Sequence, residues 1–108
     1  MTLIRPYTTG DRDAFLTLYR ECLAYYGVRP ASAGQEERIV GILESERHLS
    51  CLMAFDSEVP VGFATWVLTF PSGSDLALYM KELFVSETTR GAGVGRALMA
   101  GLVRIAER

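Results

Sequence analysis

The segment from Arg90 to Arg96 has the residue types of an anion-binding loop. It reads Arg-Gly-Ala-Gly-Val-Gly-Arg, with glycines at alternate positions between two arginines. Glycine lets the backbone turn sharply and approach a ligand closely, because it has no Cβ atom. The loop opens a predicted helix, whose first free N–H groups and dipole favour a bound anion, best a phosphate group. The flanking arginines could add charge-assisted contacts. The sequence therefore predicts a phosphate site at this loop.

Two familiar nucleotide motifs do not fit these residues. A P-loop requires Lys and then Ser or Thr after its last glycine, whereas Gly95 is followed by Arg96 and Ala97. A dinucleotide fingerprint that starts at Gly93 requires Gly or Ala where Leu98 stands, and no second strand with its acidic residue follows. What remains is Arg-x-x-Gly-x-Gly at the opening of a helix. An ordinary turn that caps the helix is the alternative interpretation.

Together with the apolar strand before it, this pattern resembles the GNAT superfamily of N-acetyltransferases. The resemblance covers the element order of the whole chain, and its specific part is residues 83–98. It implies that the loop holds the pyrophosphate of acetyl-CoA, mainly through backbone N–H groups, and that the pantetheine arm lies along the strand end like an added strand. The residues that it implies for the cofactor are Leu83, Phe84, Val85, Arg90, Gly91, Ala92, Gly93, Val94, Gly95 and Arg96.

The same resemblance implies an acyltransferase that moves an acetyl group from acetyl-CoA to a primary amine by direct attack. The amine must first lose a proton, since an alkylammonium ion has a pKa of about 10.4 in water. Glu82 is the candidate catalytic base, directly or through a water, because an apolar strand makes a carboxylate a better proton acceptor. A carboxylate that pairs with Lys81 or only binds a cationic acceptor is the alternative. A backbone N–H within residues 83–85 could stabilise the oxyanion at a local break in the strand ladder.

Residues 79–95 resemble in particular the small-amine and diamine branch of the family, which has an acidic residue before a Leu-Phe-Val type stretch. Glu82 stands at that position, but its neighbour is Lys81 rather than a second acid. The acceptor therefore stays open between small-molecule and peptide amines. A non-catalytic acyl-CoA or phosphate-binding module, used in regulation or assembly, is the second functional hypothesis.

The family domain continues beyond the helix that follows the glycine loop, with further strands and a helix that often carries a tyrosine as general acid. The resemblance thus predicts an incomplete site and an exposed sheet edge in these 108 residues. Three explanations are open: a truncated chain, completion by a partner as in a homodimer, or a shortened relative that only binds.

Hydrophobic periodicity predicts the helices that must position the loop. Apolar side chains at helical spacing predict one helix from an Asp11 N-cap to a stop at Gly27. Ser32 and Gln35 have the spacing of a capping box, which predicts a second helix to about Glu46. A last helix begins inside the glycine cluster. The stripe of the first helix consists of Phe15, Leu18, Tyr19, Cys22, Leu23 and Tyr26.

Strands account for most of the remaining chain. Residues 2–7 form a weak opening strand, and alternation over residues 48–55 predicts a strand that turns back as a hairpin into residues 61–70, with Gly62 marking a bulge. After a turn at residues 71–73, the apolar run 76–85 predicts a strand covered on both faces. This order of elements predicts the α+β fold class, and the resemblance implies a GNAT-like fold with a mixed but mostly antiparallel sheet flanked by helices. Residues 1–108 are expected to form a single domain.

Composition narrows the function classes. Hydrophobic residues make up 49% of the chain and charged residues 22%, which is typical of a globular protein. The formal net charge of −2 argues against a broad nucleic-acid-binding surface. The sequence has no run of about 20 apolar residues to span a membrane and no signal-peptide region at its start, so a cytoplasmic location is expected.

Several other residues are expected to have structural roles. Cys22 and Cys51 should be buried free thiols rather than a disulfide or nucleophiles, and no cluster of metal ligands is expected. His48 is expected to be a partly exposed structural residue. Tyr26, Trp66 and Tyr79 are expected to pack in the core, whereas Tyr25 is a candidate for the acceptor side.

Overall fold

A four-stranded antiparallel sheet connects the elements in the computed structural model, which describes residues 2–45, 47–70 and 76–107. Its strands are β1 (Thr2–Pro6), β2 (Ser50–Asp56), β3 (Val59–Thr69) and β4 (Ala77–Val85). Each strand pairs with the next one along the chain, so β1 and β4 form the edges. The α+β class expected from the sequence is confirmed.

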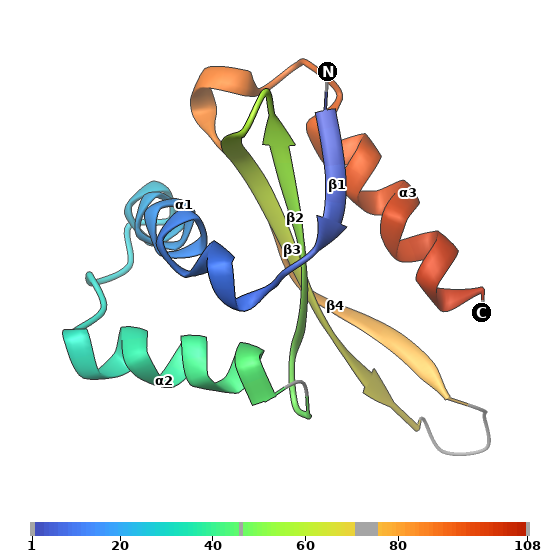
Figure 1. The fold of residues 1–108 in the computed structure, drawn as a ribbon, viewed down its shortest axis with the longest axis horizontal. Coiled ribbons are helices and arrows are strands. Elements are labelled where there is room, and N and C mark those ends of the chain that lie inside the picture. Colours follow the sequence, from blue (N-terminus) through green and yellow to red (C-terminus); the bar gives the residue numbers. More distant parts are fainter. Residues whose placement is uncertain (1, 46, 71–75, 108) are drawn as a thin grey trace.

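Helices cover both faces of this sheet (Figure 1). α1 (Arg12–Tyr25) and α2 (Ala33–Ser45) pack on one face, and α3 (Val94–Ala106) packs on the other. Two 3-10 turns, η1 (Thr9–Asp11) and η2 (Glu87–Thr89), precede α1 and the glycine loop respectively. The predicted order of strand, helix, helix, three strands and helix is therefore confirmed. Both helices at the α1–α2 face precede the strands that they cover.

The end of α1 confirms the predicted stop at Gly27. Gly27 has φ +69°, and its N–H donates to the carbonyl of Ala24 at 3.1 Å. The N–H of Val28 donates to the carbonyl of Leu23 at 2.9 Å. These two bonds form a Schellman ending, in which the left-handed residue is usually glycine. The chain consequently turns away from the axis of α1 at Gly27.

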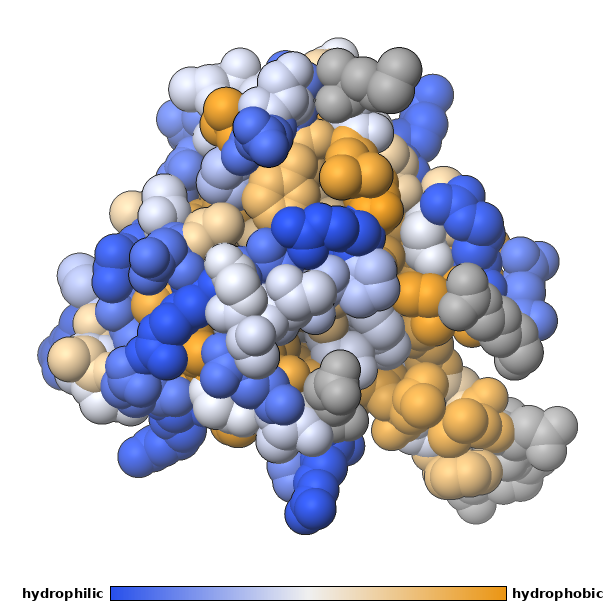
Figure 2. Space-filling model, in the orientation of Figure 1, coloured by the Kyte–Doolittle hydropathy of each residue, from blue (hydrophilic) through white to orange (hydrophobic). Residues whose placement is uncertain are grey.

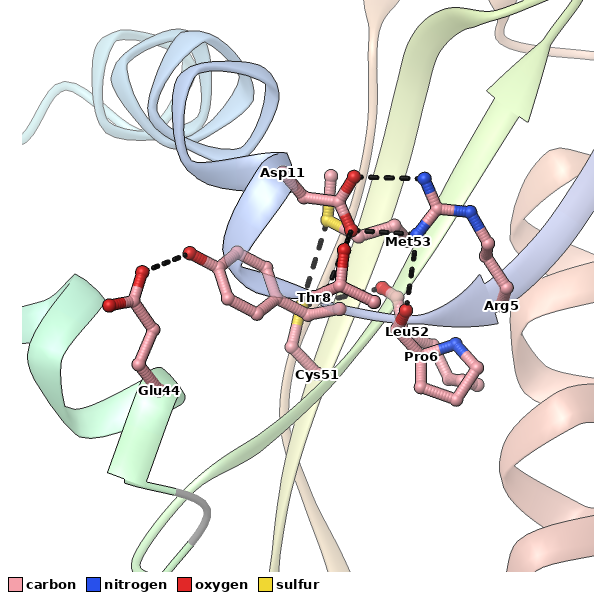
Figure 3. A network of polar contacts seen from close by, with 9 residues as sticks. Arg5, Pro6, Thr8, Asp11, Glu44, Cys51, Leu52 and Met53 are labelled. Carbon is pink, nitrogen blue, oxygen red and sulfur yellow. Dashed lines mark hydrogen bonds and ion pairs between the residues drawn. The ribbon is translucent and has the colours of Figure 1, made fainter.

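The two predicted helix starts have different outcomes. Ser32 N–H donates to Gln35 Oε1 at 2.8 Å and Gln35 N–H donates to Ser32 Oγ at 3.1 Å, which is the expected capping box of α2. Asp11 is the N-cap residue of α1, as predicted, but its carboxylate makes no capping hydrogen bond to the helix. It accepts hydrogen bonds from the Thr8 N–H at 2.8 Å and from both terminal nitrogens of Arg5 at 2.7 and 2.9 Å (Figure 3). Asp11 thus connects β1 to the start of α1.

A hydrophobic cluster lies on each face of the sheet. On the α1 and α2 face, the Phe15 and Phe63 rings are 5.1 Å apart and Phe84 is buried beside them. On the other face, Leu98 of α3 packs in a cluster that Leu83 joins from β4. Successive side chains along a strand point to opposite faces. The end of β4 therefore packs against the hydrophobic clusters on both faces of the sheet. This packing fixes the strand end that leads into the glycine loop.

The β2–β3 hairpin contains the predicted bulge. Ser57 and Glu58 form its turn with φ values of +50° and +71°. The register of β3 against β2 then skips Val61, next to Gly62, as expected. A Cβ atom at Gly62 would lie 2.8 Å from the Phe84 carbonyl oxygen. Glycine at this position thus allows β3 to approach the end of β4 closely.

Some predictions of burial are wrong. β4 is not covered on both faces, because its first half extends away from the helices (Figure 1), where the surface is apolar (Figure 2). Tyr79 on this half is 61% exposed. Tyr26 is 62% exposed, because α1 ends at Tyr25 and the helical stripe no longer applies. Trp66 is buried as expected. The predicted turn at residues 71–73 lies outside the described residues.

Candidate functional site

The glycine loop between η2 and α3 has the backbone shape that the sequence predicts. Gly91 has φ +90° and Gly93 has φ +83°, in the left-handed region that favours glycine. A Cβ atom at either position would meet nothing within 4 Å, so the space around both residues is open. The loop therefore needs its glycines for the backbone conformation rather than for tight packing.

The N-terminus of α3 presents free backbone donors. Gly93 is the N-cap, and the first intrahelical bond runs from the Ala97 N–H to the Gly93 carbonyl at 3.0 Å. The N–H groups of Val94, Gly95 and Arg96 precede that bond, so the helix itself offers them no acceptor. No acidic residue stands in the first turn of α3, and Gly93 has no side chain to cap it. The positive end of the helix dipole is thus open to an anion.

The end of β4 presents backbone groups at the open edge of the sheet. Ser86 N–H donates to the Val61 carbonyl at 2.8 Å, and the register continues this alignment to Phe63 opposite Phe84. In an antiparallel pair, hydrogen-bonded and non-bonded positions alternate. The N–H and C=O of Phe84 therefore face β3, whereas those of Leu83 and Val85 face outward. The local break in the ladder lies before residues 83–85 rather than within them, at Lys81, where the β3–β4 register skips a residue.

These two backbone surfaces meet in a groove of about 630 Å³. All the residues predicted for the cofactor line it except Ala92, whose N–H donates to the Thr89 carbonyl at 3.2 Å. Tyr25 and Tyr26 from the end of α1 complete its wall. The full lining is Tyr25, Tyr26, Leu83, Phe84, Val85, Arg90, Gly91, Gly93, Val94, Gly95 and Arg96.

Arg90 packs against the wall of this groove. Its guanidinium lies 4.0 Å over the Tyr25 ring and 5.4 Å from the Phe84 ring centre. Its Nε donates to the outward-facing Val85 carbonyl at 3.0 Å. The sequence predicted Arg90 as a direct phosphate contact, and in the structure its side chain first ties the loop to α1 and β4. Arg96, in the first turn of α3, is exposed on the lining of the groove.

Glu82 lies beside this groove but does not line it. Its side chain points to the α1 face, 30% exposed, with Oε1 at 3.7 Å from the Lys81 ammonium and 3.5 Å from the Thr65 hydroxyl. Burial raises the pKa of the Tyr19 hydroxyl, and the Glu82 charge raises it further. Glu82 therefore directly precedes the residues of β4 that line the groove, and its side chain lies on the face of the sheet that α1 covers.

Neither cysteine is a candidate nucleophile. Both are free and buried, as expected. Burial first, and then the charge of Glu82, raises the pKa of the Cys22 thiol to about 11. Burial likewise raises the pKa of the Cys51 thiol. Both thiols remain protonated near neutral pH, and the thiolate is the reactive form.

The remaining sequence candidates lie away from this site. His48 is exposed just before β2. Over residues 2–45, 47–70 and 76–107, no group of three His, Cys, Asp or Glu side chains could hold a metal ion. No helix within these ranges is long and apolar enough to cross a bilayer.

Sequence reasoning missed Glu21 and Ser86. Ser86 is buried at the end of β4, and its hydroxyl donates to Glu21 Oε1 of α1 at 2.9 Å. The two residues are 65 positions apart, so no local pattern links them. The only sequence signal is a serine directly after a strand and before a turn, which is common in proteins.

Known proteins share this architecture. A family model described as the acetyltransferase (GNAT) family matches residues 12–108. An integron cassette protein from the mobile metagenome of V. cholerae is 28% identical with a TM-score of 0.76, over 97% of this chain and 67% of that one. The structure of AAC(6')-Iy with a bisubstrate analogue, CoA-S-monomethyl-acetylneamine, has a TM-score of 0.80 at 18% identity, over 96% of this chain and 70% of that one.

A further similar structure contains the expected ligand. It is a predicted acetyltransferase from Clostridium acetobutylicum with acetyl-CoA, with a TM-score of 0.79 at 18% identity, over 99% of this chain and 74% of that one. At this level of identity the likeness concerns the fold. This chain spans about 70% of the length of such structures, as with the 70% and 74% of these last two.

Proposed function

Because the chain belongs to the GNAT acetyltransferase family, we propose that it binds acetyl-CoA in the groove between β4 and α3 and transfers the acetyl group to a primary amine. One observation carries the proposal. The outward-facing backbone of Leu83 and Val85 and the free N–H groups at the start of α3 line the same groove.

The groove fits the donor chemically. A pyrophosphate is an anion, and it suits three helix N–H groups at a first turn without acidic residues, with the exposed Arg96 beside them. The amides of a pantetheine arm can pair with an edge strand as an added strand does, which suits the outward N–H groups of Leu83 and Val85 and the outward carbonyl of Leu83. The volume of about 630 Å³ lies within the range of roughly 300 to 1,000 Å³ of small-molecule sites.

Glu82 is the proposed base for the acceptor. Acetyl-CoA supplies an activated acetyl thioester, and the acceptor ammonium must lose a proton before it can attack. The Glu82 carboxylate is partly exposed and adjoins Leu83, so it can take up this proton directly or through one water. The outward N–H groups of Leu83 and Val85 are candidates to polarise the thioester carbonyl. The N–H of Phe84 faces β3, which makes it unsuitable for this role.

We propose a small-molecule or peptide amine as the acceptor. The AAC(6')-Iy structure, with its acetylated neamine linked to CoA, supports a small-molecule amine acceptor. The assignment to the small-amine and diamine branch stays a prediction. We further propose that residues 1–108 act as one domain that contains the cofactor-binding part of the site, that the protein works in the cytoplasm, and that it can form a homodimer.

Calorimetric titration of the protein with acetyl-CoA tests the donor site. We expect saturable binding that Arg90→Glu weakens by at least about tenfold, because a negative charge replaces the cation beside the proposed pyrophosphate. Arg38→Glu is the matched control, since Arg38 is an exposed arginine on α2, away from the groove. A folded protein that does not bind acetyl-CoA, or equal losses in both variants, would contradict the proposal.

Turnover separates the enzyme from a binding module. Release of the CoA thiol is followed in the presence of a panel of diamines, aminoglycosides and peptides. We expect an amine-dependent rate that Glu82→Gln lowers by about 100-fold, the usual contribution of a general base, while acetyl-CoA affinity stays within about twofold. Binding without turnover on any amine would instead favour the non-catalytic acyl-CoA-binding alternative.

A further inference from the structure

The last turns of α1 contact the connection between β4 and α3 at two points. The first contact is made by Glu21. Its Oε1 accepts the Ser86 hydroxyl at 2.9 Å and the Glu87 N–H at 3.2 Å, where η2 begins. Ser86 is 8% exposed, so this contact lies where the chain leaves the core. Figure 1 shows the connection in orange at the end of the sheet beside α1.

The second contact is made one helical turn later. Tyr25 follows Glu21 by four residues, and side chains at this spacing lie on the same face of a helix. The Tyr25 ring supports the Arg90 guanidinium at 4.0 Å, and Arg90 Nε holds the Val85 carbonyl at 3.0 Å. One face of α1 therefore holds the connection both where it leaves β4 and where the glycine loop starts.

The glycines that follow have no comparable restraint of their own. Gly91 and Gly93 have no side chains, and a Cβ atom at either would meet nothing within 4 Å. The position of the free N–H groups of α3 relative to the edge of β4 depends in part on how the preceding residues are held. Of the two α1 side chains that contact the connection, Glu21 is the charged one. Hydrogen bonds to a carboxylate are stronger than those between neutral groups.

We propose that Glu21 is a positioning residue for the donor site: through Ser86 and Glu87 it sets the glycine loop at the distance from β4 that the two ends of acetyl-CoA require. The inference rests on the proposed function, since it assumes that acetyl-CoA binds in this groove. Glu21 itself does not line the groove and touches no proposed reacting atom. Its effect is on the pyrophosphate end of the donor, whereas the ladder at Leu83 and Val85 serves the pantetheine end.

Two donors of different length test this division. Dissociation constants are measured by calorimetry for acetyl-CoA and for acetyl-pantetheine, which lacks the nucleotide and the pyrophosphate. We expect Glu21→Ala to weaken acetyl-CoA by about tenfold and acetyl-pantetheine by no more than about twofold. Glu21→Gln keeps an oxygen that can accept the hydrogen bonds of the Ser86 hydroxyl and the Glu87 N–H. The affinity for acetyl-CoA should therefore lie within about threefold of that of the parent. Asp13→Ala, which removes an exposed carboxylate from the first turn of α1, should change neither constant.

The outcomes are distinct. If the parent protein does not bind acetyl-CoA, the proposed function itself fails. If the parent binds and Glu21→Ala binds equally well, or loses both donors equally, the positioning role is wrong and Glu21 has only a general effect on the fold. Should Glu21→Ala fail to fold, Ser86→Ala is the second variant. It removes one of the two hydrogen bonds to Glu21, and it must show the same selective loss of acetyl-CoA affinity. Circular dichroism and thermal unfolding of each variant establish which case applies.

Discussion

The guanidinium carbon of Arg90 lies over the ring of Tyr25, 4.0 Å from its centre. Arg90 is the first residue of the glycine loop motif and Tyr25 is the last residue of α1, so this stack joins two elements that are distant in the sequence. Tyr25, which the sequence made a candidate for the acceptor side, is thus part of the wall of the groove proposed for the donor.

Removal of the Tyr25 ring should loosen the donor site. Tyr25→Ala deletes the surface on which Arg90 rests, and an exposed cation–π contact contributes about 0.5–1 kcal/mol. We expect the affinity for acetyl-CoA to fall about threefold in calorimetry. Tyr25→Phe keeps the ring and should bind like the parent. A loss in Tyr25→Phe as large as in Tyr25→Ala would show that the hydroxyl, not the stack, matters.

Gly93 should tolerate no side chain for conformational reasons. Its φ of +83° disfavours any residue with a Cβ atom, at a cost of about 1–2 kcal/mol, although nothing lies within 4 Å to clash with that atom. Gly93→Ala should lower the free energy of unfolding by this amount and weaken acetyl-CoA binding.

Gly41 provides the matched control for Gly93. It lies inside α2 with equally open space around its Cβ position. Gly41→Ala should stabilise the protein by about 0.5–1 kcal/mol, because alanine favours the helix. Urea unfolding measures both variants, and changes of the same sign would contradict the conformational explanation.

Gly62 should be intolerant for a steric reason. A Cβ atom there would lie 2.8 Å from the Phe84 carbonyl oxygen, a backbone atom that cannot rotate away. Gly62→Ala should therefore lower the free energy of unfolding by about 1–3 kcal/mol and displace the end of β4. Gly34, in the first turn of α2, has its nearest contact at 3.9 Å, so Gly34→Ala should not lower stability. Normal stability of Gly62→Ala would mean that β3 and β4 can separate at no cost.

Asp11 should make stability depend on pH in the acidic range. Its hydrogen bonds with Arg5, and then those with Thr8, lower the pKa of this carboxyl below its ordinary value of 3.8. Its contribution is fully present above the unfolded value, and it is lost as the pH falls through the lowered folded value. Since Arg5 is 36% exposed and partly screened by solvent, we expect Asp11→Asn to cost only about 1 kcal/mol at pH 7.

The difference between the parent and Asp11→Asn should shrink as the pH falls below the ordinary value of 3.8, and it should disappear once the Asp11 carboxyl is protonated in both the folded and the unfolded protein. Thermal unfolding of both proteins across pH 2–7, at constant ionic strength, measures this difference in stability. A difference that stays constant over this range would show that the Asp11 charge does not contribute, and that only the shape of the side chain does.

The parts of the molecule that follow local rules could be predicted from the sequence. The capping box at Ser32, the glycine stop at Gly27 and the glycine loop before α3 each depend on a few adjacent residues. The element order follows from hydrophobic periodicity, which is likewise local. Most of the groove could be anticipated because its residues between Leu83 and Arg96 are nearly continuous in the chain, whereas Tyr25 and Tyr26 join it from the end of α1.

The remaining features depend on residues that folding brings together. Periodicity placed Tyr26 on the apolar stripe, but it could not show that the helix ends one residue earlier. It also could not show that the first half of β4 extends beyond the helices (Figure 1), which leaves Tyr79 exposed. Glu21 meets Ser86 across 65 positions, and Asp11 binds Arg5 instead of capping its own helix. Such choices among possible partners are decided by the tertiary structure.

The alternation of backbone direction at the end of β4 has a consequence for amide hydrogen exchange. Phe84 donates its N–H to the sheet, while the N–H groups of Leu83 and Val85 face the groove. In solution the amide protons of these neighbours should exchange at alternating rates, slow at Phe84 and fast on both sides of it. A ligand that lies along this edge would slow the two fast positions and leave the middle one unchanged. Amide exchange at these three residues would therefore report whether a ligand occupies the sheet edge, even when the acceptor is unknown.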